Sequence, residues 1–299
     1  MQPLAAIRSL IARHAKPGDR STVLPGVRLV TATAPTAPVN GVCEPAFALV
    51  AQGVKRTMLA DKVFDYGAGR YLVVSVDLPI VGHIVEASPE APYLAFVIRL
   101  DPAAIATLLL DVSTGAGMTA ETCGMSVSEA SNDLLDAVVR LLRLLDRPED
   151  VAVLGPMLER EILWRLLAGE QGAAVRQVGL ADSRLSQISR AIAWIRTHYA
   201  ASLRIDALAD VAGMSTSTFH RHFRAVTAMS PVQYQKRIRL LEARTRLIAD
   251  AKDVAAVGFD VGYDSPSQFS REYSRFFGAP PGKDMKRWRG DVGLAQALA

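Results

Sequence analysis

The sequence predicts an α+β protein: an N-terminal antiparallel β barrel with accessory helices, followed by an all-α domain of two helix-turn-helix units joined by a long helix. Three observations support this prediction. Short β-rich runs alternate with turn residues over residues 20–100, helical periods dominate from residue 183 onward, and the C-terminal third contains an internal repeat. We therefore expect a β domain over 1–170, a linker over 171–182 and a helical domain over 183–290.

Charge is divided unevenly along the chain. The 299 residues carry a formal net charge of +4, yet residues 182–290 hold 18 Lys and Arg against 10 Asp and Glu. A basic domain attached to a neutral one is typical of nucleic-acid-binding proteins, although many solvated helical surfaces are equally basic. The chain has no run of about eighteen apolar residues, an amphipathic N-terminus without a cleavage site and only two cysteines. These features favour a cytoplasmic protein without a membrane span.

The β domain is predicted from five short runs rich in β-branched and aromatic residues. These runs are Arg28–Thr33, Ala46–Val50, Arg70–Val76, Ile80–Ala87 and Tyr93–Leu100, and the turn signals between them include Pro25-Gly26, Asn40-Gly41 and Gly67-Ala68-Gly69. Strands at this spacing indicate an antiparallel sandwich or a small barrel.

Helical periods follow the strands. Asp101–Leu110 is expected to form a short helix with Asp101 as its cap, and apolar residues share one face over 128–146 and again over 156–168. Two interpretations stay open: both later helices cover the β domain, or the 128–146 stripe also packs against its copy in a second subunit. The glycine-rich stretch 168–182 lacks an apolar period, which favours a linker.

The C-terminal third contains one supersecondary unit twice. Residues 219–223 (FHRHF) correspond to residues 269–273 (FSREY), fifty positions later, and Ser230-Pro231 corresponds to Pro280-Pro281 at the same offset. The glycine at 213 corresponds to the glycine at 262, with one extra residue in the second turn. A repeated supersecondary unit is hard to produce by chance.

The first unit has the parts of a helix-turn-helix. These parts are a helix over Ile205–Ala212, a left-handed residue at Gly213, a cap at Ser215 and a second helix from Thr216 to about Val226. Phe219 and Phe223 are four residues apart, so they share one face and anchor the second helix, while polar side chains turn outward. This arrangement is what a major-groove reader requires.

The second unit repeats this arrangement after a long connecting helix. Its predicted parts are a cap at Asp253, a first helix over Val254–Val261, a turn at Gly262 and a second helix that begins at Ser265-Pro266 and stops at Gly278. The connecting helix runs from Ser230-Pro231 to about Ala249, with Tyr234, Ile238, Leu241 and Ile248 as its buried stripe. Its length, roughly 27 Å, can hold two recognition helices about one DNA turn apart, near 34 Å. This spacing favours DNA binding over a purely structural helical bundle.

Residues 183–289 resemble the DNA-binding domain of AraC/XylS-type regulators. The resemblance rests on LADVAGMSTSTFHRHFRAVTAMSPVQYQKRIRLLEAR and on VGYDSPSQFSREYSRFFGAPP. Upstream, EPAFALVAQGVKR and VDLPIVGHIVEASPEAPYLAFVIRLDP are similar to the cupin-like N-terminal domain of one branch of that family. The resemblance implies a transcription factor with an effector-binding or dimerising cupin domain. The chain departs from the family pattern after Pro281, where GKDMKRWRG replaces a shorter ending.

In this family, base contacts come from outward residues early in each recognition helix. The resemblance places these positions at Ser217, His220, Arg221, Ser267, Gln268 and Arg271. Arg221 and Arg271 could bind guanine in bidentate fashion, and Gln268 suits adenine. The candidates for phosphate contact are Thr216, Arg224, Lys236, Arg237 and Ser265. The alternative interpretation is that these side chains are ordinary solvated surface.

The sequence predicts no metal, cofactor or catalytic site. A metal-binding cupin needs clustered histidines with a carboxylate, and the strand region holds only His83, which we interpret as a satisfied structural histidine. His220 and His222 lie two apart on a helix and point to different faces, so they cannot share an ion. Cys43 and Cys123 are interpreted as buried small residues; the alternative for Cys123 is an exposed thiol that senses an electrophile.

We therefore predict a sequence-specific DNA-binding transcription regulator, not an enzyme, whose β domain senses a small molecule, oligomerises, or does both. The expected partners are double-stranded DNA, an unidentified small-molecule effector and a second copy bound through the N-terminal domain; RNA polymerase is left open as a further partner. One rival is a cupin-type isomerase or dioxygenase with an appended helical domain, which would need a metal site. The other is an effector-free module whose barrel only dimerises.

Overall fold

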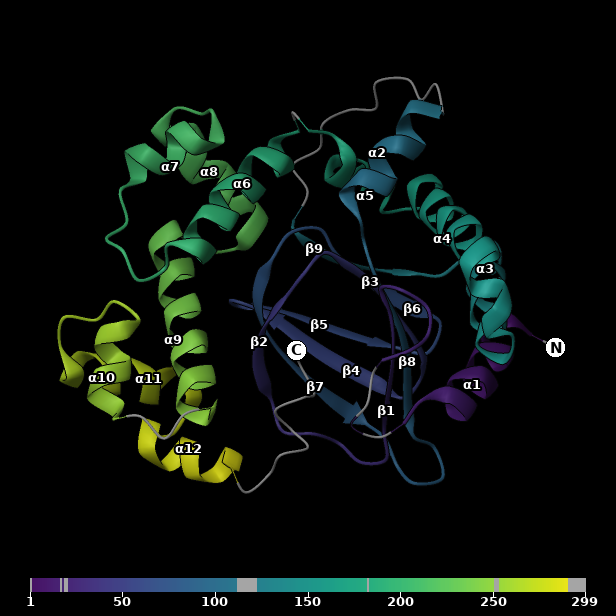
Figure 1. Ribbon diagram of the computed structural model, residues 1–299, viewed down its shortest axis with the longest axis horizontal. Coiled ribbons are helices and arrows are strands. Elements are labelled where there is room, and N and C mark those ends of the chain that lie inside the picture. The colour runs from purple at the N-terminus through teal and green to yellow at the C-terminus, as the bar shows by residue number, and fades with distance from the viewer. Residues whose placement is uncertain are drawn as a thin grey trace.

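Figure 1 shows the β domain flanked by its own helices on one side and by the C-terminal helices on the other. The computed structural model describes residues 2–16, 18, 21–111, 123–181, 183–249 and 253–289. Within these residues no helix is both long enough and apolar enough to cross a membrane.

Two antiparallel sheets form the β domain. The first sheet has the order β1 (Val27–Ala32), β8 (Tyr93–Arg99), β3 (Ala46–Gln52), β6 (Arg70–Val74) and β9 (Met125–Glu129). The second sheet has the order β2 (Val39–Cys43), β7 (Leu78–Glu86), β4 (Val54–Leu59) and β5 (Lys62–Gly67). Alternate side chains of the first sheet enter two different cores, as strand geometry requires: Phe47 and Phe96 face the covering helices, while Val50 and Val74 face the second sheet.

The five predicted strands correspond to β1, β3, β6, β7 and β8, whereas β2, β4, β5 and β9 were not predicted. The expectation of a turn at Asn40-Gly41 is wrong, because both residues lie within β2 and pair with Val81 and Ile80 of β7. A neighbouring strand that supplies a full ladder of hydrogen bonds overrides a local turn preference.

Helices α1 (Pro3–His14), α3 (Asn132–Arg143) and α4 (Val151–Ala168) cover the outer face of the first sheet. Two 3₁₀ turns, Leu144–Asp146 and Pro148–Asp150, join α3 to α4. The apolar stripe of α3 is buried in this core, which confirms the interpretation that the helix covers the β domain; its buried members are Leu134, Leu135, Val138, Leu141 and Leu142. Leu145, the last predicted member, lies in the 3₁₀ turn after α3 and is half-buried. These side chains therefore already pack against residues of their own chain.

Two further helices lie against the β domain. Helix α2 (Pro102–Asp111) begins as predicted, with the Asp101 carboxylate accepting the Ala103 amide hydrogen bond at 3.0 Å. Helix α5 (Gly172–Gly179) occupies the segment 171–182, which was interpreted as a linker. Buried Gln171 precedes it and is hydrogen-bonded to Ser126 and Ser128 of β9 at 2.6 and 3.1 Å. The connection between the domains is thus a packed helix.

The C-terminal helices are α6 (Arg184–Thr197), α7 (Ile205–Ala212), α8 (Thr216–Thr227), α9 (Pro231–Ala249), α10 (Val254–Asp260), α11 (Pro266–Phe277) and α12 (Pro281–Arg289). Figure 1 shows α7 and α8 at one end of α9 and α10 and α11 at the other. The first unit shares a continuous core with the inside of the β domain, in which Phe219 and Phe223 join Val76 and Met125. The second unit has a separate core around Phe269.

The predicted buried stripe of α9 is half right. Tyr234 and Ile238 are buried, but Leu241 and Ile248 are only half-buried. Both line a pocket of about 500 Å³ between α9 and β2. Leu247, on another face of α9, is fully buried in the core of the second unit. The stripe is displaced because α9 enters two cores: Tyr234 and Ile238 join the core shared with the β domain, whereas Leu247 joins the core of the second unit.

Candidate nucleic-acid interface

The turn of the first unit has the predicted chemistry. Gly213 ends α7 in the left-handed region, with φ of 66°. Ser215 caps α8, because its hydroxyl accepts a hydrogen bond from the amide of Thr218 at 3.4 Å. The rings of Phe219 and Phe223 are fully buried with centroids 5.4 Å apart, so one face of α8 is fixed to the core. These predictions are confirmed.

The second unit repeats the geometry fifty residues later. Ser265 caps α11 by accepting from the amide of Gln268 at 3.4 Å, and Gly262 holds the turn with φ of 93°. Phe269 and Tyr273 are buried with ring centroids 5.6 Å apart. The repeat extends to the ends of both helices, where Ala228 and Gly278 adopt left-handed conformations with φ of 57° and 76°. The internal repeat is therefore a structural repeat.

The opposite faces of the two recognition helices are exposed. The six candidates for base contact all lie on these faces: Ser217, His220 and Arg221 on α8, and Ser267, Gln268 and Arg271 on α11. His222, two residues from His220, is buried, so the two rings point to different faces as predicted. The polar surface that DNA readout requires is thus accessible on each helix.

Glu272 orients the side chain of Gln268, and sequence reasoning missed this role. The Gln268 amide nitrogen donates to Glu272 at 3.1 Å, while Lys236 and Tyr263 donate to the same carboxylate at 2.9 Å each. Burial alone would raise the pKa of Glu272, but these hydrogen bonds hold it below its ordinary value. An amide has two N–H donors and a carbonyl acceptor, so Gln268 keeps one donor and its oxygen for a base. The sequence signal is the spacing of four between Gln268 and Glu272.

The candidates for phosphate contact fall into two groups. Thr216 and Arg224 are exposed on α8, and Ser265 is the half-buried cap of α11. Lys236 and Arg237, in contrast, line a pocket between α9 and the β domain. The Arg237 guanidinium lies 5.8 Å from the ring centroid of Phe276, and burial lowers its pKa.

Side chains of α9 hold the two units together, and the sequence analysis did not identify them. Arg239 donates to the backbone carbonyl oxygens of Tyr199 at 2.6 Å and Gly262 at 2.7 Å. Gln235, which is buried, donates to the Tyr199 carbonyl at 3.0 Å and the Ala201 carbonyl at 2.8 Å. Because these bonds join α9 to the loop before α7 and to the second turn, they fix the spacing of the recognition helices.

A polar contact ties the first unit to the β domain. Arg196 of α6 pairs with the Asp77 carboxylate at 2.5 Å, and the Tyr234 hydroxyl donates to the Asp77 carbonyl oxygen at 2.8 Å. Near this contact the Gly124 amide donates to the Val226 carbonyl oxygen at 2.9 Å. The shared apolar core and these bonds dock the first unit on the strands.

No group of three or more metal-ligating side chains occurs among the described residues. We expected both ring nitrogens of His83 to be hydrogen-bonded, and this is wrong for one of them. Its Nδ1 is buried and has no hydrogen-bond partner among the residues that the structure describes. Cys43 and Cys123 are half-buried and not fully buried as interpreted, and desolvation raises the pKa of the Cys43 thiol. The Cys123 sulfur lies 3.7 Å from the Lys62 ammonium nitrogen.

Comparison with known proteins agrees with this architecture. Residues 23–174 match the family described as the AraC-type transcriptional regulator N-terminus, and residues 208–287 match a helix-turn-helix domain. The chain belongs to the AraC-type transcriptional regulators. The HTH-type transcriptional activator RhaS of Escherichia coli O1:K1 / APEC is 28% identical over 159 residues. That match spans 53% of this chain and 56% of RhaS, about half the length of each.

Solved structures show the same fold for nearly the whole AraC-type chain. An apo form of a ToxT point variant from Vibrio cholerae strain SCE256 aligns with a TM-score of 0.54 and 7% identity, covering 89% of this chain and 98% of ToxT. Wild-type ToxT from the same strain, bound to an unsaturated fatty acid, aligns with a TM-score of 0.53 and 7% identity over 87% of this chain and 94% of ToxT. At this identity the likeness shows the fold alone.

Proposed function

We propose that this AraC-type regulator binds double-stranded DNA sequence-specifically by placing α8 and α11 in successive major grooves, and that it acts in the cytoplasm on transcription. One observation carries the proposal: each recognition helix buries its aromatic face and exposes its three candidate base-reading side chains. Helix α9 has 19 residues and is about 28 Å long. This length suits two helices that enter grooves about 34 Å apart.

The test compares cognate and random DNA. Arg271→Ala removes a bidentate guanine contact, so we expect a loss of about 1–3 kcal/mol on a cognate site, or roughly 5- to 150-fold. Random DNA should lose much less, because its binding depends on phosphate charges. The DNA that flanks the protein's own coding region is the probe, titrated at several salt concentrations. Arg143→Ala, an exposed arginine on α3, is the matched control. Equal losses on both DNAs would refute base readout by Arg271.

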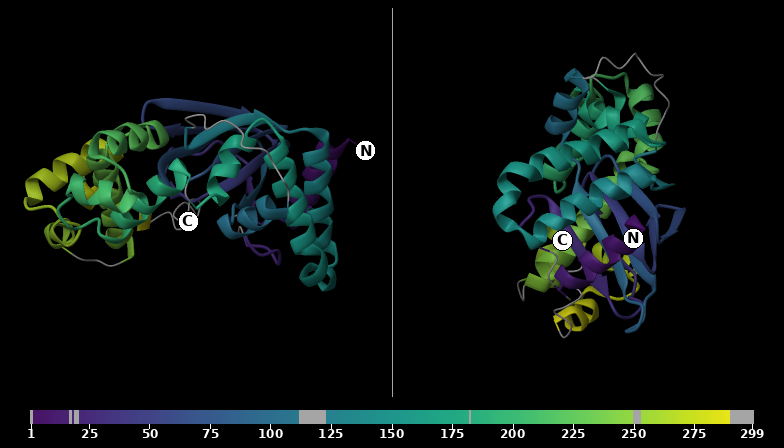
Figure 2. Two further views of the ribbon diagram at one scale, coloured as in Figure 1. Left: turned by 90° about the horizontal axis from the view of Figure 1, so that it is seen from above. Right: turned by 90° about the vertical axis from the view of Figure 1, so that its right-hand side faces the viewer.

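We also propose that the β domain binds a small-molecule effector and that two copies associate through α4. Helix α4 buries Ile162 and Leu166 against the core, yet Val153 and Met157 are 69% and 65% exposed on its other side, followed by Trp164 at 37%. A helix that is apolar on both sides is typical of one with a second partner. Figure 2 shows α4 and the C-terminal helices at opposite ends of the molecule, so a dimer through α4 leaves the recognition helices free.

Light scattering tests the dimer. Met157→Lys places a charge in the proposed interface and should convert a dimer to a monomer at micromolar concentration. Leu110→Lys, on the 87% exposed end of α2, should leave the mass unchanged. A monomeric parent protein, or a Met157→Lys variant that stays dimeric, would contradict the α4 interface.

A further inference from the structure

A buried carboxylate holds helix α12 against the second unit. The Asp284 carboxylate, which is 3% exposed, accepts hydrogen bonds from the Arg244 guanidinium at 2.9 and 3.0 Å. It also accepts one from the Tyr273 hydroxyl at 2.9 Å. Because Arg244 belongs to α9 and Tyr273 to α11, these bonds join α12 to both helices. Arg244 also neutralises Asp284, which is the only acidic residue of α12.

The opposite side of α12 carries only positive charges. Lys283, Lys286 and Arg287 are exposed, and their spacing of three and four residues places them on one side of the helix. No ion pair joins any of the three to another residue that the structure describes. The helix therefore presents three uncompensated cations while its single acid is paired inside the protein.

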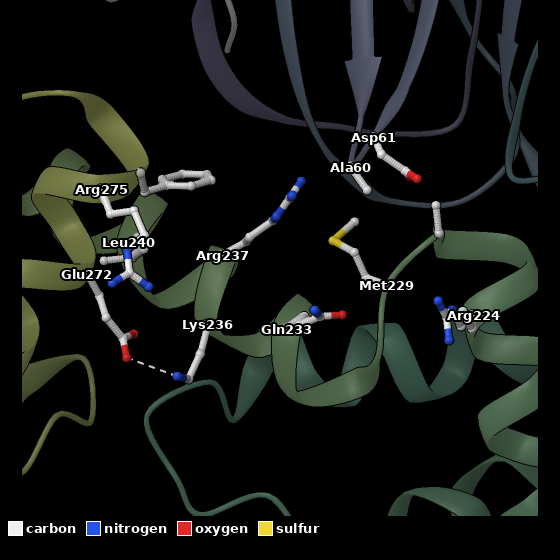
Figure 3. A pocket seen from close by; sticks show the side chains of 12 residues that line it. Ala60, Asp61, Arg224, Met229, Gln233, Lys236, Arg237, Leu240, Glu272 and Arg275 are labelled. Atoms are coloured by element: carbon white, nitrogen blue, oxygen red, sulfur yellow. Dashed lines mark hydrogen bonds and ion pairs between the residues drawn. The ribbon is translucent and has the colours of Figure 1, made fainter.

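This cationic side of α12 continues the face of α11 that carries the candidate base contacts. Arg271 and Arg275 are exposed and four residues apart on α11, so they share one face. Figure 3 shows the Glu272 carboxylate joined to Lys236 of α9, so it does not pair with Arg275. Arg275 and Arg287 line the same pocket, which has a volume of about 510 Å³. A row of guanidinium groups thus leads from Arg271 to α12.

The β domain offers these cations no negative partner. The residues of the β domain that line this pocket are uncharged, namely Ala37, Pro38, Val39, Asn40, Met58 and Val81. The other charged groups of the lining are Arg244 and Asp284, which neutralise each other. Docking of the two domains therefore does not explain the charge on α12, and an anionic partner outside the chain does.

The position of α12 favours the DNA backbone as that partner. Figure 1 shows α7 and α8 at one end of α9, α10 and α11 near the other end, and α12 beyond them in the same direction. A duplex whose successive major grooves receive α8 and α11 runs along this direction, so its continuation passes α12. Such a duplex carries one negative charge per about 1.7 Å of its axis, and the lysine ammonium binds phosphate as a point charge.

The internal repeat supports the same partner. At the offset of fifty residues, Lys286 and Arg287 correspond to Lys236 and Arg237, which are candidates for phosphate contact. In the first unit Lys236 pairs with Glu272 at 2.9 Å, and Arg237 is half-buried. The second unit has the same two cations in exposed positions, where a phosphate can reach them without breaking an ion pair.

We infer that α12 is a third DNA-binding element, which contacts phosphates on the outer side of the second major groove and reads no bases. The inference rests on the proposed function, because it requires α11 to lie in that groove. Its consequence is that α12 adds affinity on any sequence and lengthens the contact with DNA at the end of the site that α11 occupies.

The salt dependence of DNA binding tests this role. The full chain is titrated at several salt concentrations onto random DNA and onto the DNA that flanks its coding region. Each lost phosphate contact makes the slope of log affinity against log salt less steep by about 0.9, so Lys283→Gln/Lys286→Gln should reduce it by about 1.8. At about 0.1 M salt this corresponds to a roughly 10- to 100-fold weaker complex on both DNAs. Lys283→Arg/Lys286→Arg keeps both charges and should bind like the parent.

A second double variant controls for net charge. Arg8→Gln/Arg143→Gln removes two exposed cations from α1 and α3, which lie on the far side of the β domain (Figure 1), and should leave the slope unchanged. If Lys283→Gln/Lys286→Gln has the same slope as this control, or weakens binding to the flanking DNA alone, the inference fails.

Footprinting separates this inference from the proposed function. The parent should protect the backbone on the outer flank of the patch that depends on Arg271, and Lys283→Gln/Lys286→Gln should lose this flank while the rest of the patch persists. Loss of the whole patch in that variant, or protection of the flank equal to the parent's, would overturn the inference. If the parent binds random and flanking DNA equally, base readout fails, and the salt slopes still decide whether α12 contacts phosphates.

Discussion

Replacing Gly262 with alanine tests how the second helix-turn-helix is held against the first. Gly262 has φ of 93°, and a Cβ at this position would lie 2.3 Å from the carbonyl oxygen of Ala200. That carbonyl belongs to the loop before α7, which Arg239 also binds at 3.2 Å. Because the obstacle is backbone, relief of the clash requires the loop and the second turn to separate. The substitution therefore strains the contact that fixes the two units.

The free-energy cost of Gly262→Ala can be worked out by comparison with Gly278→Ala. Gly278 belongs to the same unit and has φ of 76°, but a Cβ there would meet nothing within 4 Å. Gly278→Ala should cost only the left-handed conformation, about 1–2 kcal/mol. Gly262→Ala adds a steric term of about 1–3 kcal/mol, as for overpacked sites. The difference between the two variants is thus about 1–3 kcal/mol.

Hydrogen exchange followed by mass spectrometry measures this difference. The second unit has its own core, so we expect it to open locally, with α10 and α11 exchanging roughly 5- to 150-fold faster in Gly262→Ala than in Gly278→Ala. Helices α1 and α3 should exchange as in the parent. Equal protection in the two variants would show that the Ala200 contact does not hold the second unit, and would refute the packing argument.

Three further predictions concern polar contacts. Glu272→Ala releases the Gln268 amide, so preference for a cognate site over one with its adenine replaced should fall about 3- to 10-fold in competition binding; an unchanged preference would exclude an orienting role. Asp77→Asn breaks the partly exposed ion pair with Arg196 and should lower the free energy of unfolding in urea by about 1 kcal/mol. Asp206→Asn, at a fully exposed ion pair with Arg204, is the control and should leave that free energy nearly unchanged. The third prediction concerns pH: the pKa of Glu272 in the folded protein lies below the ordinary value for glutamate. The hydrogen bonds to its carboxylate are therefore complete above the ordinary glutamate pKa, and they are lost only as the pH falls through the lower pKa of the folded protein. The base preference should therefore be flat between pH 5 and 8, and a rise or fall within this window would contradict that protonation state.

The helical domain could be predicted in detail because local chemistry determines its ends. Ser215 and Ser265 cap helices through hydrogen bonds within four residues, and Gly213 and Gly262 adopt backbone angles that few other residues tolerate. Such signals depend on adjacent residues alone. The exposure of the six candidate base contacts followed from the same helical periods.

The parts that escaped prediction depend on distant residues. Strands β4 and β5 are joined by a turn at Ala60, a residue with φ of 55° and no turn signature in the sequence. Strand β2 contains a sequence that favours a turn, yet its partner β7 makes it extended. Glu272 and Arg239 acquire their roles from helices that meet only in the folded chain. The pocket that Lys236 and Arg237 line could not be predicted for the same reason, since residues 60 and 61, which also line it, lie far along the chain from α9 and α11.

Hydroxyl-radical footprinting of the DNA that flanks the coding region tests the central claim most directly. Two recognition helices on one face should protect two patches about 10–10.5 base pairs apart, on the same side of the duplex, for each bound chain. Arg221→Ala should weaken one patch and Arg271→Ala the other. A single protected patch, two patches on opposite sides of the duplex, or the loss of both patches in either variant with its fold intact would contradict the account.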